Sequence, residues 1–250
     1  MGWNIGANDT ANCIGTTVGC GLISFKRAAI LVAVFSIIGA VLQGDHVMKT
    51  IGKGIVRGDL DYTAIFVALL CSGFFVTLAT FYRIPTSTSQ AIVGGILGIG
   101  LAVRADIDYS KVVTIVESWI VCPILTMALA FCFYRLLDLV MRRIKTSSLL
   151  VQNALGRMAL LSSCYLAYSM GANNAGNAVG PISNLGIIHP KILLFIGGGA
   201  IAIGAITYGR KVADTVGKGI TPLDIPGAFV AQLASGLGMH LFAMWGIPVS

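Results

Sequence analysis

The first polar run of the sequence, GANDTANCIG at residues 6–15, places Asn8, Asp9 and Asn12 close together in a mostly apolar chain. Carboxylate and carboxamide oxygens suit hard cations, and amide N–H groups can donate to an anion without adding fixed charge. The run is either a solvated turn with helix-capping side chains or a site that holds a polar species inside a membrane. Because a carboxylate inside a membrane is costly and usually functional, we interpret Asp9, with Asn8 and Asn12, as ligands of a cation.

A second polar cluster, PTSTS at residues 85–89, offers four hydroxyl groups in a row, those of Thr86, Ser87, Thr88 and Ser89. Hydroxyls can donate to the oxygens of an anion. Pro85 is expected to start a helix whose N-terminus these side chains cap, and the N-terminus of a helix favours negative charge. A bare Asp9 would repel an anion bound there, so a cation, Na⁺ or H⁺, is expected between them.

The sequence repeats itself. GANDTANCIG returns as GANNAGNAVG at 171–180, a shift of 165 residues. At the same shift, residues 39–55 (GAVLQGDHVMKTIGKGI) return as 204–220 (GAITYGRKVADTVGKGI), and at nearly the same shift IPTS at 84–87 returns as IPVS at 247–250. Three blocks in one order indicate a duplicated unit, the arrangement of many secondary transporters.

The two copies differ in charge and in completeness. Asn174 stands where the first copy has Asp9, so the two halves need not bind cations equally. The second motif follows a full apolar segment, 154–170, whereas the first follows five residues, and the second IPVS ends at Ser250. The repeat therefore predicts a chain that is incomplete at both ends, with a naturally short protein as the alternative. The predicted organisation is a single transmembrane transporter domain with repeat 1 at 1–134, a basic loop at 135–147 and repeat 2 at 148–250.

The composition is that of a membrane protein. Hydrophobic residues make up 56% of the chain and charged residues 11%, whereas soluble proteins carry about 25% charged residues. Apolar segments near the length of about 20 residues that spans a bilayer lie at 28–43, 62–82, 110–134, 154–170, 191–208 and 226–245. Segments rich in Gly, Asn, Ser and Thr, which we expect to be re-entrant or broken helices around a protein-enclosed cavity, lie at 6–25, 85–102 and 171–188. The predicted fold is an all-α polytopic membrane protein.

The charged residues lie mostly between these segments. Lys and Arg outnumber Asp and Glu by 17 to 10, an excess that we assign to topology-setting loops and not to nucleic-acid binding. The basic stretch 135–147 is expected to be cytoplasmic, or else an amphipathic surface helix. Lys53 and Lys218 recur in the repeated GKGI block, as loop charges or as attractors of anions at an entrance. Glu117, inside an apolar segment, is a possible proton or cation relay, the partner of a basic residue, or a residue near the membrane interface.

Enzymatic motifs are absent from the sequence. The six cysteines have no metal-ligand spacing, so no transition metal and no cofactor are expected. GKG at 52–54 lacks the remainder of a phosphate-binding loop, and no GxSxG elbow occurs. An enzyme is therefore not expected, whereas an ion channel or a membrane scaffold stays open as another class.

The paired GAND and GANN motifs, together with IPTSTSQAIVGGILGIGLA at 84–102, resemble the inorganic phosphate transporter family over nearly the whole chain. Members of that family are cation-coupled phosphate permeases built from two inverted repeats, with a central site for phosphate and Na⁺, or H⁺ in some members. The resemblance implies substrate-binding roles for Thr86, Ser87, Thr88, Ser89, Gln90, Asn177 and Ser250. It implies cation-binding roles for Asn8, Asp9, Asn12, Asn173 and Asn174.

The resemblance predicts import of inorganic phosphate by symport with Na⁺ or H⁺, at a site near the midplane of the membrane. The expected location is the plasma membrane, with the lipid bilayer as environment, no nucleic acid as partner, and the oligomeric state, a homo-oligomer included, left open. Asn174 replaces an Asp of many members and Gln90 a His, which leaves the coupling ion and its number open. A sulfate or other oxyanion permease is the nearest alternative. Because phosphate carries a P–OH donor that sulfate lacks, a carboxylate that accepts this proton would favour phosphate.

Overall fold

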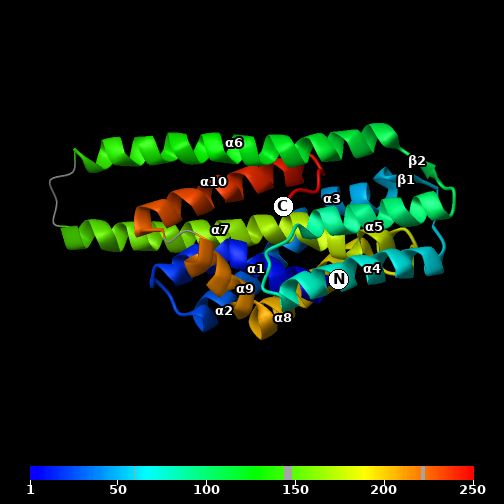
Figure 1. The fold of residues 1–250 in the computed structure, drawn as a ribbon, viewed down its shortest axis with the longest axis horizontal. Coiled ribbons are helices and arrows are strands. Elements are labelled where there is room, and N and C mark those ends of the chain that lie inside the picture. Colours follow the sequence, from blue (N-terminus) through cyan, green and yellow to red (C-terminus); the bar gives the residue numbers. More distant parts are fainter. Residues whose placement is uncertain (59, 144–147, 221–222) are drawn as a thin grey trace.

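The computed structural model describes residues 1–250 except 59, 144–147 and 221–222 (Figure 1). Two short π-helical segments, η1 (Thr50–Gly54) and η2 (Thr215–Ile220), end the two copies of the repeated GKGI block, and β1 (Val56–Arg57) pairs antiparallel with β2 (Asp106–Ile107). The α-helices of the described chain are α1 (Gly2–Gly19), α2 (Phe25–Gln43), α3 (Asp45–Lys49), α4 (Tyr62–Phe81), α5 (Thr88–Ala102), α6 (Tyr109–Met141), α7 (Ser148–Ser183), α8 (Pro190–Tyr208), α9 (Arg210–Asp214) and α10 (Ile225–Met244).

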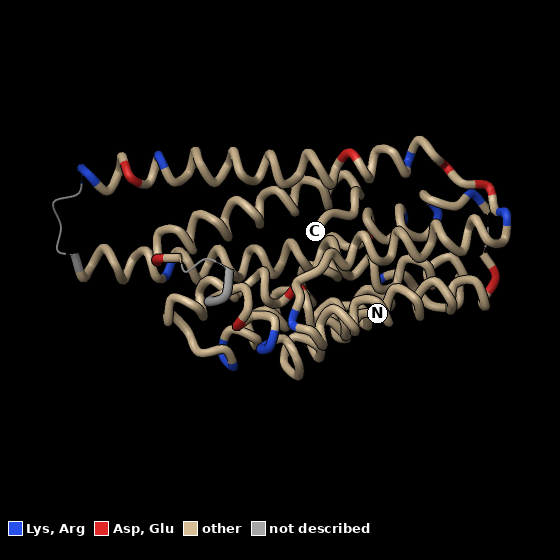
Figure 2. The backbone as a smooth tube through the Cα atoms, in the orientation of Figure 1, with Lys and Arg blue, Asp and Glu red and all other residues tan. Residues whose placement is uncertain are grey.

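Helix length and apolarity confirm the all-α polytopic membrane fold. Five of the described helices, α2, α4, α6, α8 and α10, are long and apolar enough to cross a bilayer. Figure 2 shows charged residues towards both ends of the long axis and others near its middle, and α10 contains no Lys, Arg, Asp or Glu. Most of the apolar surface of α6 is exposed. A long apolar surface on a membrane-spanning helix is suited to contact with lipid.

Two segments differ from the sequence-based expectation. Residues 171–183 do not form a broken helix, because they continue α7, a single helix of 36 residues. Residues 6–19 likewise belong to the continuous helix α1. The prediction of broken helices there was wrong, because glycine and asparagine disfavour an isolated helix but here find close helix contacts and hydrogen-bond partners on neighbouring elements. The end of the predicted basic loop at 144–147 lies outside the described residues, and its start, 135–141, belongs to α6.

The hydroxyl cluster starts a short helix, as expected, but at a different residue. Helix α5 begins at Thr88 and spans 15 residues, fewer than a membrane crossing needs. Ser87 caps it, because its Oγ accepts a hydrogen bond of 3.1 Å from the backbone N–H of Gln90. Pro85 therefore lies in the extended segment before the helix and does not start it.

Glycines allow α1 and α8 to cross at backbone contact. A Cβ atom on Gly6 would collide with the backbone of Ile201, and one on Gly204 would collide with the backbone carbonyl of Trp3. Small residues at such positions are the usual means by which membrane helices approach closely. The repeat-equivalent residues make the same crossing between α7 and α2. There a Cβ atom on Gly171 would collide with the backbone of Ser36, and one on Gly39 would collide with the backbone carbonyl of Tyr168. Each half thus packs its first helix against the second helix of the other half.

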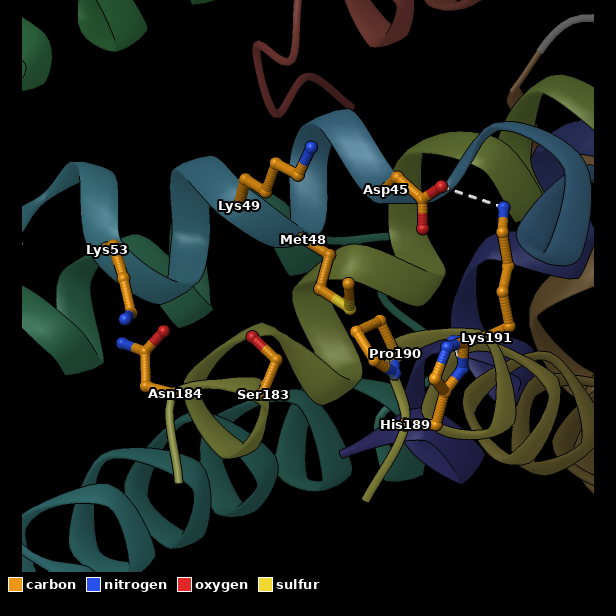
Figure 3. A pocket seen from close by; sticks show the side chains of 9 residues that line it. All are labelled: Asp45, Met48, Lys49, Lys53, Ser183, Asn184, His189, Pro190 and Lys191. Carbon is orange, nitrogen blue, oxygen red and sulfur yellow. Dashed lines mark hydrogen bonds and ion pairs between the residues drawn. The ribbon is translucent and has the colours of Figure 1, made fainter. Parts of the chain in front are cut away.

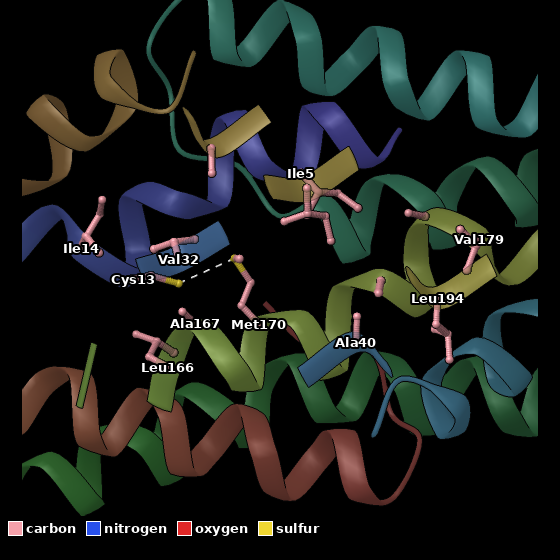
Figure 4. Close-up of a cluster of buried hydrophobic side chains, with 14 of the residues drawn as sticks. Ile5, Cys13, Ile14, Val32, Ala40, Leu166, Ala167, Met170, Val179 and Leu194 are labelled. Atoms are coloured by element: carbon pink, nitrogen blue, oxygen red, sulfur yellow. Dashed lines mark hydrogen bonds between the residues drawn. The ribbon is translucent and has the colours of Figure 1, made fainter. Parts of the chain in front are cut away.

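Helices α1 and α7 lie side by side and run in opposite directions. The Sγ of Cys13 lies 3.6 Å from the Sδ of Met170 (Figure 4), and further along, Asp9 lies 2.7 Å from Asn174. The residue numbers fall along one helix while they rise along the other, so the helices are antiparallel. Asp9 and Asn174 are equivalent positions of the repeat, and they meet each other. The polar motifs of the two halves therefore contact each other where α1 and α7 pack together.

Candidate substrate and cation site

Asp9 lies at the centre of a buried polar cluster. Its Oδ2 accepts two hydrogen bonds of 2.7 Å, one from the hydroxyl of Thr88 at the start of α5 and one from the Asn174 amide on α7. Its Oδ1 is buried without any hydrogen-bond partner. The residue is 2% exposed, and no Lys, Arg or His of the described chain forms an ion pair with it. A carboxylate so placed needs a cation or a proton to offset its charge.

Asn177 extends this cluster along α7. Its amide donates to the Ser89 hydroxyl at 2.8 Å and to the Oδ1 of Asn174 at 3.2 Å. Ser89 in turn donates to the backbone carbonyl of Val249 at 2.8 Å. The Oδ1 of Asn177 is buried and, like that of Asp9, has no partner. The cluster therefore holds two buried acceptor oxygens with unfilled capacity, the pattern that a hard cation or a hydrogen-bond-donating ligand would fill.

The start of α5 supplies the complementary donors. Thr88 and Ser89 are the first two residues of the helix, and N–H groups in a first helical turn have no acceptor within the helix. The N-terminus of a helix also carries partial positive charge. Because Thr88 bonds directly to Asp9, this donor end lies next to the acceptor cluster. An anion and a cation could therefore be bound side by side here.

Asn8 anchors the segment that leads into α5. Its amide donates to the carbonyl of Ile84 at 3.0 Å and to the hydroxyl of Thr80 at 2.9 Å, and its Oδ1 accepts from the backbone N–H of Thr86 at 3.0 Å. The contacts with Ile84 and Thr86 hold the loop around Pro85, and the contact with Thr80 ties Asn8 to the end of α4. The structure thus shows Asn8 positioning the loop, and its predicted role as a cation ligand stays a prediction.

Asn173 makes the equivalent contacts in the second half. Its amide donates to the carbonyl of Ile247 and its Oδ1 accepts from the backbone N–H of Val249, both at 3.3 Å. These two loop residues correspond in the repeat to the pair that Asn8 holds. Its side chain, too, positions a loop, so the first asparagine of each motif holds a proline-containing segment.

Several predicted residues lie apart from the cluster. Asn12 and Ser250 are exposed and line another cavity of about 520 Å³, together with Thr16 and Gln232. Gln90 is exposed, and the structure gives no side-chain hydrogen bond for it in the described chain. The half-buried residues Thr86 and Ser87 contribute a backbone N–H to Asn8 and a helix cap. Glu117 is exposed on α6 without an ion-pair partner in the described chain, so the structure does not bring it to the site.

One buried polar residue was missed by the sequence analysis. Gln232 on α10 is 2% exposed and donates to the carbonyl of Cys13 at 2.8 Å and to the hydroxyl of Thr16 at 2.6 Å. Its Oε1 accepts a hydrogen bond from Ser163 on α7. It ties α10 and α7 to the second half of α1. The sequence does contain a signal for this residue. Gln232 is the one carboxamide in the apolar segment 226–245, and such a group needs a hydrogen-bond partner inside the membrane.

The fold and this site define a multi-pass membrane protein with a buried polar site between two similar halves, the general architecture of a secondary transporter. The chain belongs to the phosphate transporter family, whose family model matches residues 5–250. The predicted family is thus confirmed.

Individual relatives agree with this assignment. A putative phosphate permease of Pyrococcus horikoshii is 31% identical over 100% of this chain and 82% of its own length. A sulfate permease of Bacillus subtilis is also 31% identical, over 98% of this chain and 69% of its own length. Among solved structures, a protein described as the sodium-dependent phosphate transporter matches with a TM-score of 0.89 and 26% identity, covering 100% of this chain and 83% of that one.

Proposed function

We propose that this protein imports inorganic phosphate by symport with Na⁺. The observation that carries the proposal is the buried Asp9, whose charge has no basic partner in the described chain and whose Oδ1 has no hydrogen-bond partner. A permanently uncompensated carboxylate at this depth would be strongly destabilising. A coupling cation that arrives with the substrate removes that cost, and the sodium dependence in the name of the matched solved structure supports Na⁺ over H⁺.

In this proposal the cation and the anion occupy opposite sides of one cluster. The cation takes the free oxygens of Asp9 and Asn177, which supply hard oxygen ligands. The phosphate takes the N-terminal turn of α5, with the backbone N–H groups of Thr88 and Ser89 as donors. Phosphate at neutral pH also carries a P–OH group, for which a carboxylate oxygen is an acceptor. Each ion thereby offsets the charge of the other, which couples their binding.

The proposed transport mechanism is alternating access, and it rests on the packing of each half's first helix against the second helix of the other half. We infer that the halves form inverted repeats, because α1 and α7 are antiparallel and the crossings of α1 with α8 and of α7 with α2 are equivalent. Asp9 lies near the middle of α1, which supports a site near the membrane midplane. In such transporters one set of helices rocks against the other around a fixed site. We place the protein in the plasma membrane.

The test is uptake of radiolabelled phosphate by the full-length protein in liposomes, with a Na⁺ gradient, a proton gradient or neither imposed. We expect saturable uptake that the Na⁺ gradient drives. Uptake that ignores the Na⁺ gradient and follows the proton gradient would replace Na⁺ by H⁺. A conductance without saturable, gradient-driven uptake would instead indicate a channel, and the absence of both would indicate a scaffold.

Sulfate is the second candidate substrate. The alignment with the sulfate permease spans 249 positions for 98% of this chain, so it needs few gaps. The alignment with the phosphate permease of Pyrococcus horikoshii spans 335 positions for the 250 residues of this chain, so that relative contains segments without a counterpart here. Competition decides between the two: we expect excess sulfate to leave phosphate uptake largely intact, and strong inhibition accompanied by labelled sulfate uptake would reverse the assignment.

A further inference from the structure

A second cavity, of about 410 Å³, lies between the α3–η1 segment and the junction of α7 with α8 (Figure 3). Three lysines and a histidine line it, with one acidic residue. In Figure 3, Lys53 reaches from η1 towards Asn184 at the end of α7, and Lys191 reaches from the start of α8 to Asp45. None of these residues takes part in the hydrogen bonds of the Asp9 cluster, so this cavity is separate from the site described above.

The positive charge of the cavity is only partly compensated. Lys191 lies 2.7 Å from Asp45, the one acidic residue of the lining. Lys49 and Lys53 have no ion-pair partner in the described chain. Both lysines line the cavity, Lys53 pointing towards Asn184 and Lys49 to the other side of the α3–η1 segment in Figure 3, and the one acidic residue of the lining is already paired with Lys191.

The polar groups around the cavity offer donors. The Lys191 ammonium uses two of its three hydrogens on Asp45 and on the carbonyl of Val41, each at 2.7 Å, which leaves one. The His189 Nδ1 accepts from the backbone N–H of Lys191 at 3.3 Å, so in the neutral ring Nε2 carries the proton and can donate. The Asn184 amide is already bonded to the carbonyl of Gly52. This lining would repel a cation and suits an anion whose oxygens accept hydrogen bonds.

The cavity lies where helices end. Helix α7 ends at Ser183 and α8 begins at Pro190, and Lys49 and Lys53 are both exposed. The ends of membrane-spanning helices lie at the level of the lipid headgroups or of the water beyond them. An anion could therefore reach the cavity from solution or from the headgroup layer. Lys218, the repeat counterpart of Lys53, lies outside the residues whose side chains are described.

We propose that this cavity is a superficial anion site that binds a phosphate-type oxyanion group through Lys49, Lys53 and Lys191. The group is either a free oxyanion, which would then be concentrated beside the transport pathway, or the headgroup of an anionic phospholipid. The first case rests on the proposed transport function, and the second does not. Both use the same chemistry, a tetrahedral acceptor group held by ammonium donors.

The test measures how fast each lysine is acylated by an amine-reactive reagent, by mass spectrometry of the full-length protein in nanodiscs. Phosphatidylcholine nanodiscs with phosphate, sulfate or chloride at equal ionic strength form one arm, and phosphatidylglycerol nanodiscs with chloride form the other. Lys26, exposed at the other end of α2, is the internal reference. We expect acylation of Lys49 and Lys53 relative to Lys26 to fall about fivefold in one arm, equivalent to about 1 kcal/mol.

The arms assign the ligand without relying on transport. Protection by phosphate or sulfate but not by chloride indicates a free oxyanion, and protection by phosphatidylglycerol alone indicates a headgroup. The variant K191Q should weaken either protection, whereas K211Q, a change at an exposed lysine of α9 outside the cavity, should not. A ratio of Lys49 and Lys53 acylation to Lys26 acylation that stays the same in every condition would overturn the proposal. Because acylation needs no transport, protection without any phosphate uptake would leave this site standing while the proposed transport function failed.

Discussion

The two GAN motifs hold their loops in the same way but differ where they meet. Asn8 and Asn173 each bridge a carbonyl and an N–H group around a proline. At the next position the halves diverge, because Asp9 faces Asn174 across the contact of α1 and α7. The positioning of the loops is therefore duplicated, whereas the charge is not. A second carboxylate would repel the first, and here an amide donor replaces that repulsion with a hydrogen bond.

Removing the one charge should have the largest effect. Asp9→Asn makes the two halves alike, and we expect Na⁺-dependent uptake to fall about 100-fold, which corresponds to about 2.7 kcal/mol and lies within the range for hydrogen bonds to charged groups. Initial rates measured against Na⁺ concentration test this. Asp106→Asn, a change at an exposed acid outside the site, is the matched control and should behave as the wild type. Unchanged Na⁺ activation in Asp9→Asn would remove Asp9 from cation binding.

The converse change gives the second half the carboxylate that only the first half has. Asn174→Asp removes the amide that donates to Asp9 and places two carboxylates together, so we expect about 2 kcal/mol of destabilisation without Na⁺. Na⁺ should restore more thermal stability in the variant than in the wild type, and the Hill coefficient for Na⁺ should rise. Thermal unfolding and uptake, each against Na⁺ concentration, measure these effects. Equal Na⁺ responses in both proteins would mean that position 174 does not set the number of ions.

Removing the side chains of Asn8 and Asn173, which hold the two loops, should have smaller effects on stability, and Asn8 should matter more. Asn8 makes three hydrogen bonds of 2.9–3.0 Å, whereas Asn173 makes two of 3.3 Å. We expect Asn8→Ala to cost about 2 kcal/mol and Asn173→Ala about 1 kcal/mol, from the usual worth of buried hydrogen bonds. Thermal unfolding in detergent compares the pair. The reverse order would show that hydrogen-bond geometry does not govern how firmly each loop is held.

The smallest effect is expected next to the paired strands β1 and β2, where Arg57 lies against Asp108. The backbone N–H of Lys111 and the guanidinium of Arg57 lower the pKa of Asp108 below its ordinary value. A lowered folded-state pKa contributes stability that is present above the unfolded-state pKa and is lost as the pH falls through the folded-state pKa. Asp108→Asn should therefore lower the unfolding temperature slightly at neutral pH and hardly at all in strong acid. An equal difference at both pH values would exclude the charge of Asp108 as the cause.

Sequence patterns predicted the membrane fold and most helices because apolar runs of spanning length have few alternatives in a bilayer. They failed for the GAN segments, which are continuous helices where broken ones were expected. Local composition favours a break there, but Gly6 and Gly171 are buried at backbone contacts made by distant helices. Tertiary packing overrides helix propensity in such cases, and propensity is all that a local pattern expresses.

For the site, the sequence alone establishes the duplicated motifs, the membrane setting and the single charge difference between Asp9 and Asn174. The packing of the helices establishes that these two residues touch and that Asn8 and Asn173 hold loops. It also establishes that Asn177 joins the cluster while its repeat partner Asn12 is exposed. The physical reason is that contacts between residues 165 apart depend on where helices cross. Each crossing is set by the small residues of both partners together, which spacing along one chain does not encode.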